Sequence, residues 1–184
     1  RNGLQVDVAM LKLAPMDQHG YFNFSLTNSA TRAIIEAAKV VIVETDKNLP
    51  VALGGRDECV HISEVDYVVD GGDYPAFELP VGSFDEVDRR AAAFVVEEIV
   101  DGAVLQLGIG GMPTAIAEFI ADRRHLGIHT ELLVDGVYKL CQSGAVDNSR
   151  KTLLPGKIVA AFALGSADLY RFMDHNPDLL IMRG

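Results

Sequence analysis

The sequence contains no tryptophan and only two cysteines, Cys59 and Cys141, among its 184 residues. The two cysteines are far apart and form no C-x-x-C pattern, which argues against a dithiol redox centre or a thiolate metal site. We expect two reduced thiols rather than a disulfide or a catalytic thiol. The histidines show no metal-ligand spacing, so we assign no metal site and no permanently bound cofactor.

Long apolar runs are also missing: none reaches the roughly 20 residues that a membrane-spanning helix needs. The first residues, R-N-G-L-Q-V-D-V, show no signal-peptide pattern and lead directly into a strand-like run, as in a piece of a longer protein. Basic residues are in the minority, with 16 Lys and Arg against 26 Asp and Glu, for a net charge of -10. An acidic chain is a poor partner for nucleic acid. We therefore expect a cytoplasmic protein with no membrane or nucleic-acid partner.

Apolar residues are plentiful, at 49% of the chain, and their spacing predicts an α/β protein. Residues 6–14 read as a strand, residues 28–39 as a helix capped by Asn28 or Ser29, and residues 40–44 as a buried strand. A strand–helix–strand unit indicates a parallel sheet with a right-handed crossover.

A stretch rich in glycine and proline, residues 71–83, lacks periodicity and marks a domain boundary. We expect a first domain over residues 1–82 and a second over residues 83–184. The second domain is predicted to contain strands at 104–107, 128–134 and 158–164 and helices at 85–100, after Pro113, at 135–143 and at 166–174. The predicted fold is thus two open, mainly parallel, doubly wound α/β units.

A glycine turn follows the first strand of the second domain. Gly108, Gly110 and Gly111 remove side chains, so that backbone N–H groups can approach a ligand, and Pro113 suits the first turn of the next helix. Such a turn lies at the positive end of a helix and suits an oxyanion or a phosphate. A tight turn without a ligand is the plain alternative. A nicotinamide-binding turn is another, although Pro113 occupies its third glycine position.

Glu131 is the residue that most needs an explanation. In the predicted strand at 128–134 it shares one face with His129, and a carboxylate is unusual on a strand of a parallel sheet. A structural carboxylate paired with a buried Arg or Lys is the alternative to a catalytic one. His129 either orients Glu131 or packs as a hydrogen-bonded histidine, and we expect Asp135 to cap the following helix rather than to take part in chemistry.

Several motifs in their order resemble the acetyl-CoA hydrolase/transferase family, with 4-hydroxybutyrate and butyrate–acetate CoA-transferases as the most similar members. They are P-M-D-Q-H-G-Y-F-N-F-S (15–25), H-I-S-E-V-D-Y-V-V (61–69), G-I-G-G-M-P (108–113), H-T-E-L-L-V-D-G (129–136) and K-T-L-L-P-G-K-I-V-A-A-F-A-L-G-S (151–166). The resemblance covers nearly the whole chain. Members of the family are much longer two-domain α/β proteins, which implies that both domains are incomplete here.

The resemblance implies that Glu131 is the nucleophile, which takes up CoA as a glutamyl-CoA thioester and passes it from an acyl-CoA to a free carboxylate. It implies no metal, CoA and small carboxylates as substrates, and a homo-oligomer. The residues it places at the oxyanion and CoA site are Gln106, Leu107, Gly108, Ile109, Gly110 and Gly111, with His129 and Asp135 in support. Val134 departs from the serine common in relatives, which bears on substrate preference.

Three other functions stay open at this point. An acyl-CoA hydrolase would use the same residues, with water resolving the thioester. A nicotinamide-dependent oxidoreductase would use the glycine turn, and a fragment without catalysis would at most bind CoA. We also considered that Arg150, Lys151 and Lys157 meet the CoA phosphates, against the alternative that they lie in a solvated loop.

Overall fold

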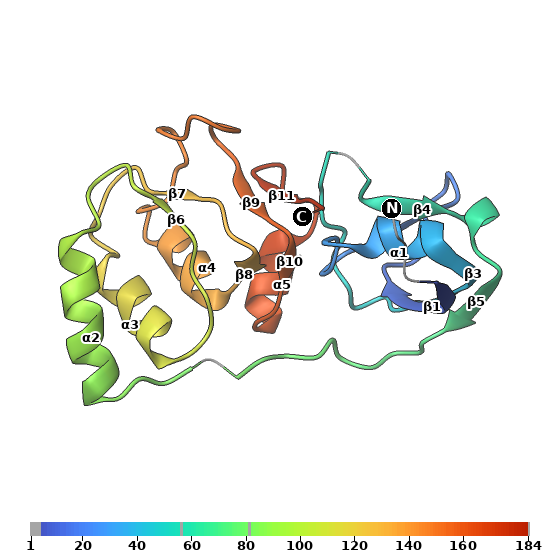
Figure 1. Cartoon of the computed structure of the whole chain (residues 1–184), viewed down its shortest axis with the longest axis horizontal. Helices are drawn as coiled ribbons and strands as arrows, with labels where there is room; N and C mark the ends of the chain where they lie inside the picture. Colours follow the sequence, from blue (N-terminus) through green and yellow to red (C-terminus); the bar gives the residue numbers. More distant parts are fainter. Residues whose placement is uncertain (1–4, 56, 81, 184) are drawn as a thin grey trace.

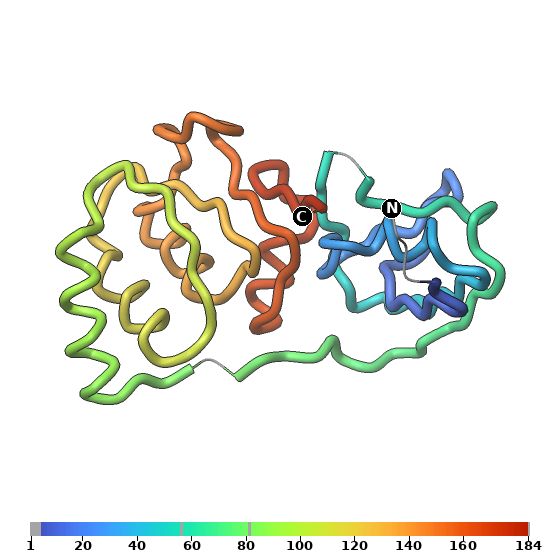
Figure 2. The backbone as a smooth tube through the Cα atoms, viewed as in Figure 1, coloured from blue at the N-terminus to red at the C-terminus, as the bar shows by residue number. Residues whose placement is uncertain are grey.

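The chain is described by a computed structural model that covers residues 5–55, 57–80 and 82–183. Its elements fall into two groups along the chain (Figure 1). A long segment without helix or strand, residues 71–80 and 82–84, leads from the first group to the second (Figure 2). None of the helices in these ranges is long and apolar enough to cross a membrane.

The first group is built on a parallel sheet of β1 (Val6–Leu13), β3 (Ala38–Thr45) and β5 (Tyr67–Asp70), with β3 in the middle. Helix α1 (Thr31–Ala37) connects β1 and β3, which confirms the predicted strand–helix–strand unit. Strands β2 (Tyr21–Asn23) and β4 (Cys59–His61) form an antiparallel pair, and a short 3-10 helix, η1 (Ile62–Glu64), follows.

The predicted cap of this helix is wrong. Helix α1 begins at Thr31 without a side-chain cap, and the Asn28 side chain instead donates to the carbonyl of Ile181, 3.0 Å away. The backbone N–H groups of Asn28 and Ser29 donate to the carbonyl of Ala161. These two residues therefore connect the first group of elements to the second, a role that local sequence cannot reveal.

The second group alternates short strands and helices. They are α2 (Glu86–Glu97), β6 (Val104–Leu105), α3 (Gly111–Phe119), β7 (Gly127–Ile128), β8 (Leu132–Leu133), α4 (Asp135–Gln142), β9 (Ile158–Ala160), β10 (Phe162–Ala163), α5 (Ala167–Met173) and β11 (Leu179–Ile181). The strand pairs β6–β7, β8–β10 and β9–β11 are all parallel, so the predicted fold class, a mainly parallel α/β architecture, is confirmed.

Two predicted strands are interrupted. The strand expected at 128–134 breaks between β7 and β8 at Glu131, and the one expected at 158–164 breaks between β9 and β10 at Ala161. Ala161 changes partners here, because its N–H donates to Glu131 while its carbonyl accepts from the segment that contains Asn28.

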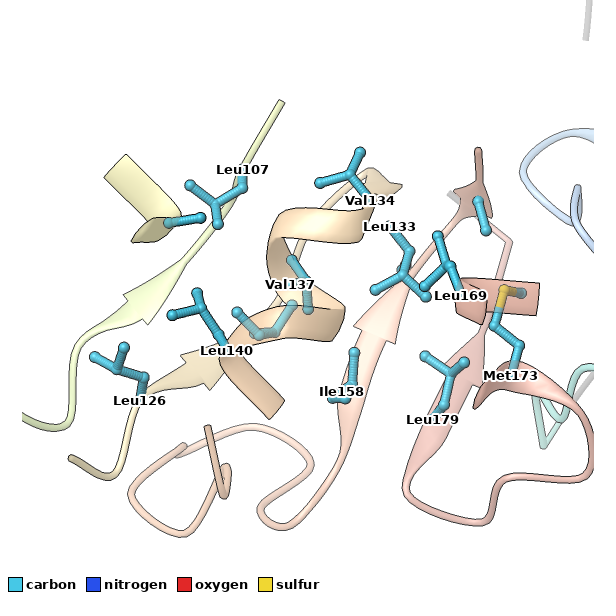
Figure 3. Packing of buried hydrophobic residues seen from close by; sticks show 14 of the residues in the cluster. Leu107, Leu126, Leu133, Val134, Val137, Leu140, Ile158, Leu169, Met173 and Leu179 are labelled. Atoms are coloured by element: carbon cyan, nitrogen blue, oxygen red, sulfur yellow. The ribbon is translucent and has the colours of Figure 1, made fainter. Parts of the chain in front are cut away.

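The core of the second group lies between its strands and helices α3, α4 and α5. Figure 3 shows Leu169 and Met173 of α5 beside Leu133 and Leu179 of the strands. A separate cluster fills the first group, between its sheet, α1 and the β2–β4 pair. The segment between the groups also contacts the second group, since the N–H of Leu79 donates to the carbonyl of Gly165. The division into domains at residue 82 stays a prediction.

Candidate active site

The glycine turn lies between β6 and α3, as expected from the sequence. Gly110 has φ 114°, a conformation that only glycine adopts without strain, and it is the N-cap of α3. Its carbonyl accepts from the N–H and the hydroxyl of Thr114, which closes the first turn of the helix around Pro113. The turn is therefore a fixed structure, with the N-terminal end of α3 directed toward it.

The neighbouring glycines serve different purposes. A side chain at Gly108 would enter open space, so its absence leaves the backbone accessible. A side chain at Gly111 would collide with the carboxylate of Asp88, which belongs to the capping box of α2. Gly111 thus allows α2 to pack against the start of α3, whereas Gly108 leaves space at the turn for another molecule.

Glu131 lies at the bend between β7 and β8. Its backbone carbonyl accepts from the N–H groups of Ala161 and Phe162, at 2.9 and 3.1 Å, while its side chain is exposed. Within the described residues no hydrogen bond or ion pair engages its carboxylate, which does not support the alternative of a structural carboxylate paired with a buried cation. His129 is likewise exposed, and its N–H is held by the carbonyl of Leu105.

Thr130 joins the glycine turn to Glu131, a connection that the sequence analysis missed. The side chain is only 5% exposed, and its Oγ1 lies 3.3 Å from the carbonyl of Leu107 and 3.1 Å from that of Leu132. Strands β6 and β7 pair Leu105 with Ile128, so the same register places Leu107 level with Thr130. The available signal was strand alternation, which turns Thr130 to the face opposite His129 and Glu131.

A pocket of about 440 Å³ lies between the glycine turn, α3 and the start of α4. Of the predicted site residues, its walls contain Leu107, Gly108, Ile109, Gly110 and Asp135. Gln106, Gly111, His129 and Glu131 are not among the described residues that line it. Most of the wall is apolar, and the polar side chains in it are those of Thr114, Glu118, Asp135 and Lys139.

Asp135 does not cap its own helix, so that expectation is wrong. It is the first residue of α4, whose N-cap is Val134, and its carboxylate is bonded to the N–H and the hydroxyl of Ser166, the N-cap of α5. The aspartate therefore connects the N-terminal ends of two helices beside the pocket.

Lys151, in the basic segment, differs from both expectations, whereas Arg150 agrees with the solvated-loop alternative. Lys151 is only 6% exposed, and its Nζ donates to the carbonyls of Ile128 and Lys157 at 2.7 and 2.6 Å, so this ammonium group is not free for a phosphate. Burial lowers the pKa of Lys151. Lys157 donates to the carbonyl of Pro177, and Arg150 is exposed. No group of three or more His, Cys, Asp or Glu side chains suited to a metal occurs within the described ranges.

Fold and site together define an open parallel α/β protein. A glycine turn and a glutamate that is unpaired within the described ranges follow the adjacent strands β6 and β7, at the edge where such sheets bind ligands. Residues 1–77 match the family model of the acetyl-CoA hydrolase/transferase N-terminal domain. The chain is 41% identical over 174 residues to a 4-hydroxybutyrate coenzyme A transferase of Clostridium kluyveri, covering 95% of this chain and 40% of that protein. A butyryl-CoA:acetate CoA-transferase of Anaerostipes caccae is 43% identical over 178 residues, with the same coverage.

Solved structures give the same result. RipA from Yersinia pestis superposes with a TM-score of 0.89 at 36% identity, over 96% of this chain and 40% of that one. A 4-hydroxybutyrate CoA-transferase from Porphyromonas gingivalis has a TM-score of 0.86 at 34% identity, over 95% and 44%. These matches confirm the predicted resemblance: residues 1–77 match the model of the acetyl-CoA hydrolase/transferase N-terminal domain, and the chain is similar to CoA-transferases over nearly its whole length. The chain spans about 40% of the length of the curated relatives it matches.

Proposed function

We propose that the chain carries the nucleophile and part of the CoA site of a CoA-transferase. The enzyme would move CoA between an acyl-CoA, of acetyl, butyryl or 4-hydroxybutyryl type, and a free carboxylate. The observation that carries this proposal is the exposed carboxylate of Glu131, which has no partner among the described residues and is tied through Thr130 to a glycine turn with an open backbone. The similarity of the chain to a 4-hydroxybutyrate coenzyme A transferase and a butyryl-CoA:acetate CoA-transferase supports the choice of substrates.

In the proposed reaction, a carboxylate oxygen of Glu131 attacks the thioester carbonyl and displaces the CoA thiolate, which leaves a mixed anhydride on the enzyme. The thiolate then attacks the glutamyl carbonyl and releases the first carboxylate, giving a glutamyl-CoA thioester. A second carboxylate reverses the two steps, leaves as the new acyl-CoA and restores Glu131. No proton, electron or ATP is consumed, because each step exchanges one anion for another.

The glycine turn and the pocket fit two needs of this chemistry. Backbone N–H groups at the start of α3 stabilise the oxyanion that forms when the thioester carbonyl is attacked. The mostly apolar pocket beside Gly108 and Gly110 suits the chain of CoA or the acyl group. Lys139 and Asp135 supply charge at its rim.

Hydrolysis is the second candidate, because the exposed position of Glu131 gives water access to a glutamyl thioester. Release of CoA without an acceptor carboxylate would favour it. A nicotinamide-dependent oxidoreductase lacks such support, since Pro113 lies in the first turn of α3 at the position where a third glycine is needed. Titration with NAD tests it directly. The homo-oligomer and the cytoplasmic location stay predictions.

Intact-mass spectrometry after incubation with acetyl-CoA, with borohydride as the trap, tests the proposal. Borohydride reduces a glutamyl thioester to an alcohol, so we expect a mass change that peptide mapping assigns to Glu131. Glu131→Gln should show no change, while Glu97→Gln, which alters an exposed glutamate of α2 outside the pocket wall, should be labelled like the unmodified chain. Labelling of a full-length relative but not of this chain would mean that the chain lacks part of the site. Absence of labelling in both would reject Glu131 as the nucleophile.

A further inference from the structure

Two buried side chains bond both backbone polar groups of Ile128, three residues before Glu131. Oδ1 of Asn148 accepts from the N–H of Ile128 at 2.9 Å, and Nζ of Lys151 donates to its carbonyl at 2.7 Å. Both side chains come from the loop between α4 and β9. We call this pair, Asn148 and Lys151, the Ile128 clamp.

The clamp replaces a missing strand neighbour. On one side, β7 is paired with β6 through the N–H groups of Gly127 and His129. Ile128 directs its N–H and carbonyl to the opposite side, toward β9, but β9 begins only at Ile158. The described bridge to β9 is formed by Val159 with His129, just after β7. A buried backbone group without a hydrogen-bond partner destabilises the fold, so two side chains occupy the places that a strand would fill.

The cationic group of the clamp is held without a counter-ion. Asn148 and Lys151 are 4% and 6% exposed, and within the described residues no carboxylate pairs with Lys151. The second bond of its Nζ goes to the carbonyl of Lys157, directly before β9. Burying an ammonium group without an anion lowers stability. A methionine would fill the space without that cost, but it would leave the carbonyls of Ile128 and Lys157 unconnected.

We propose that the Ile128 clamp positions the nucleophile: by tying the end of β7 to the start of β9, Asn148 and Lys151 hold Glu131 in place beside the glycine turn. The hydrogen bonds of Thr130 and Glu131, which come next along the chain, depend on the distance between β7 and β9. The N–H of Thr130 donates to the carbonyl of Val159 at 2.9 Å. The carbonyl of Glu131 accepts from the N–H groups of Ala161 and Phe162. Both clamp residues act through the backbone. This inference rests on the proposed role of Glu131.

The test compares the rate of Glu131 labelling by acetyl-CoA and borohydride in Lys151→Met and in a matched control, Lys157→Met. Lys157 lies on the same loop and also donates to a backbone carbonyl, that of Pro177, but it does not contact Ile128. We expect Lys151→Met to lower the saturated labelling rate about 10- to 100-fold, the size of effect that a small misplacement of a reacting group produces. The acetyl-CoA concentration for half-maximal labelling should stay unchanged, and Lys157→Met should behave like the unmodified chain.

A second pair of variants covers the possibility that Lys151→Met does not fold. Asn148 has φ 57°, so Asn148→Gly removes the acceptor without backbone strain, while Asn148→Asp keeps an acceptor for Ile128. The clamp predicts slow labelling for the glycine variant and a rate within about twofold of the original for the aspartate variant. Folded clamp variants that label at the original rate, or a control that slows equally, would overturn the proposal.

Amide hydrogen exchange separates this inference from the proposed function. If neither the unmodified chain nor a full-length relative is labelled, the proposed function fails, and exchange still tests the clamp. We expect the N–H groups of Thr130 and Ala161 to exchange faster in Lys151→Met or Asn148→Gly than in the Lys157→Met control. Unchanged exchange at both amides would reject a positioning role.

Discussion

The carboxylate of Asp135 accepts a hydrogen bond from the backbone N–H of Ser166 at 3.0 Å and is bonded to its hydroxyl as well. Asp135 is the first residue of α4 and Ser166 is the N-cap of α5. One negative charge thus lies at the positive ends of two helices. The rings of Tyr138 and Phe172, with centroids 5.3 Å apart, join the same two helices further along.

Removing this charge should destabilise the protein. We expect Asp135→Asn to lower the free energy of unfolding by about 2 kcal/mol, because it weakens two charge-assisted hydrogen bonds in a half-buried place. Urea unfolding at pH 7 measures it. Asp122→Asn is the control, since Asp122 is 76% exposed and pairs only with its neighbour Arg123, so a change within about 0.5 kcal/mol is expected. Equal losses in the two variants would contradict the structural role of Asp135.

Thr130 offers a sharper test of the connection between turn and nucleophile. Thr130→Val keeps the shape but removes the hydroxyl near the carbonyls of Leu107 and Leu132, whereas Thr130→Ser keeps the hydroxyl. We expect the valine variant to lose about 1 kcal/mol or more of stability through the missing donor, and to be labelled at Glu131 more slowly than the serine variant. Urea unfolding and the borohydride assay provide the two measurements. The role of Thr130 would be refuted by a valine variant that matches the serine variant in both.

The helices and strands that are marked by a cap or an apolar pattern within a short stretch of sequence were predicted correctly. Helix α2 starts where Asp85 was expected to start it, with a capping box to Asp88, and β3 covers the β-branched run at residues 40–44. Helices α3 and α4 likewise lie close to the places expected for them, around Pro113 and at residues 135–143. These predictions succeeded because caps and periodicity act within one or two turns of chain.

The failures concern partners that are distant in sequence. The strand through Glu131 breaks because its neighbour changes at Ala161, and Ala161 changes because Asn28 and Ser29 bind it from the other end of the chain. Lys151 lies in a polar loop whose composition suggests solvent, yet the loop folds over β7 and buries the amine. Sequence patterns do not encode which strand lies next to which. The positions of the glycine turn and of Glu131 along the chain were therefore predictable, but the contacts around them were not, and the assignment of the site residues stays a prediction.

The two thiols should differ from free cysteine in reactivity. Both are free of a disulfide, and burial raises the pKa of the Cys141 thiol to about 12 and raises that of Cys59 as well. Since the thiolate is the reactive form, Cys141 should react with a disulfide reagent at pH 8 far more slowly in the folded chain than in urea. Cys59→Ser leaves Cys141 as the sole reporter. Equal rates in folded and unfolded protein would show that Cys141 is accessible.

Asp147 should make stability depend on acid pH. Its carboxylate accepts from the N–H and the hydroxyl of Ser149, at 2.9 and 2.7 Å, and lies 2.7 Å from Nδ1 of His125. The Ser149 backbone bond first, then its hydroxyl and His125, lower the pKa of Asp147 from 3.8 to about 2. A folded pKa below the unfolded one means that the carboxylate stabilises the fold above pH 4 and loses this effect as the pH falls toward 2.

The corresponding measurement is the free energy of unfolding in urea, compared between the unmodified chain and Asp147→Asn from pH 6 to pH 2. The side chain of Asp147 is 43% exposed, so solvent screening limits the difference in unfolding free energy between the two proteins to about 1 kcal/mol at pH 6. We expect the difference to hold down to about pH 4 and then to shrink toward zero, because protonation removes the charge that the hydrogen bonds favour. Ser149→Ala, which keeps the N–H donor but removes the hydroxyl, should retain part of the dependence. A difference that stays constant across the whole range would show that these bonds do not favour the charged form of Asp147.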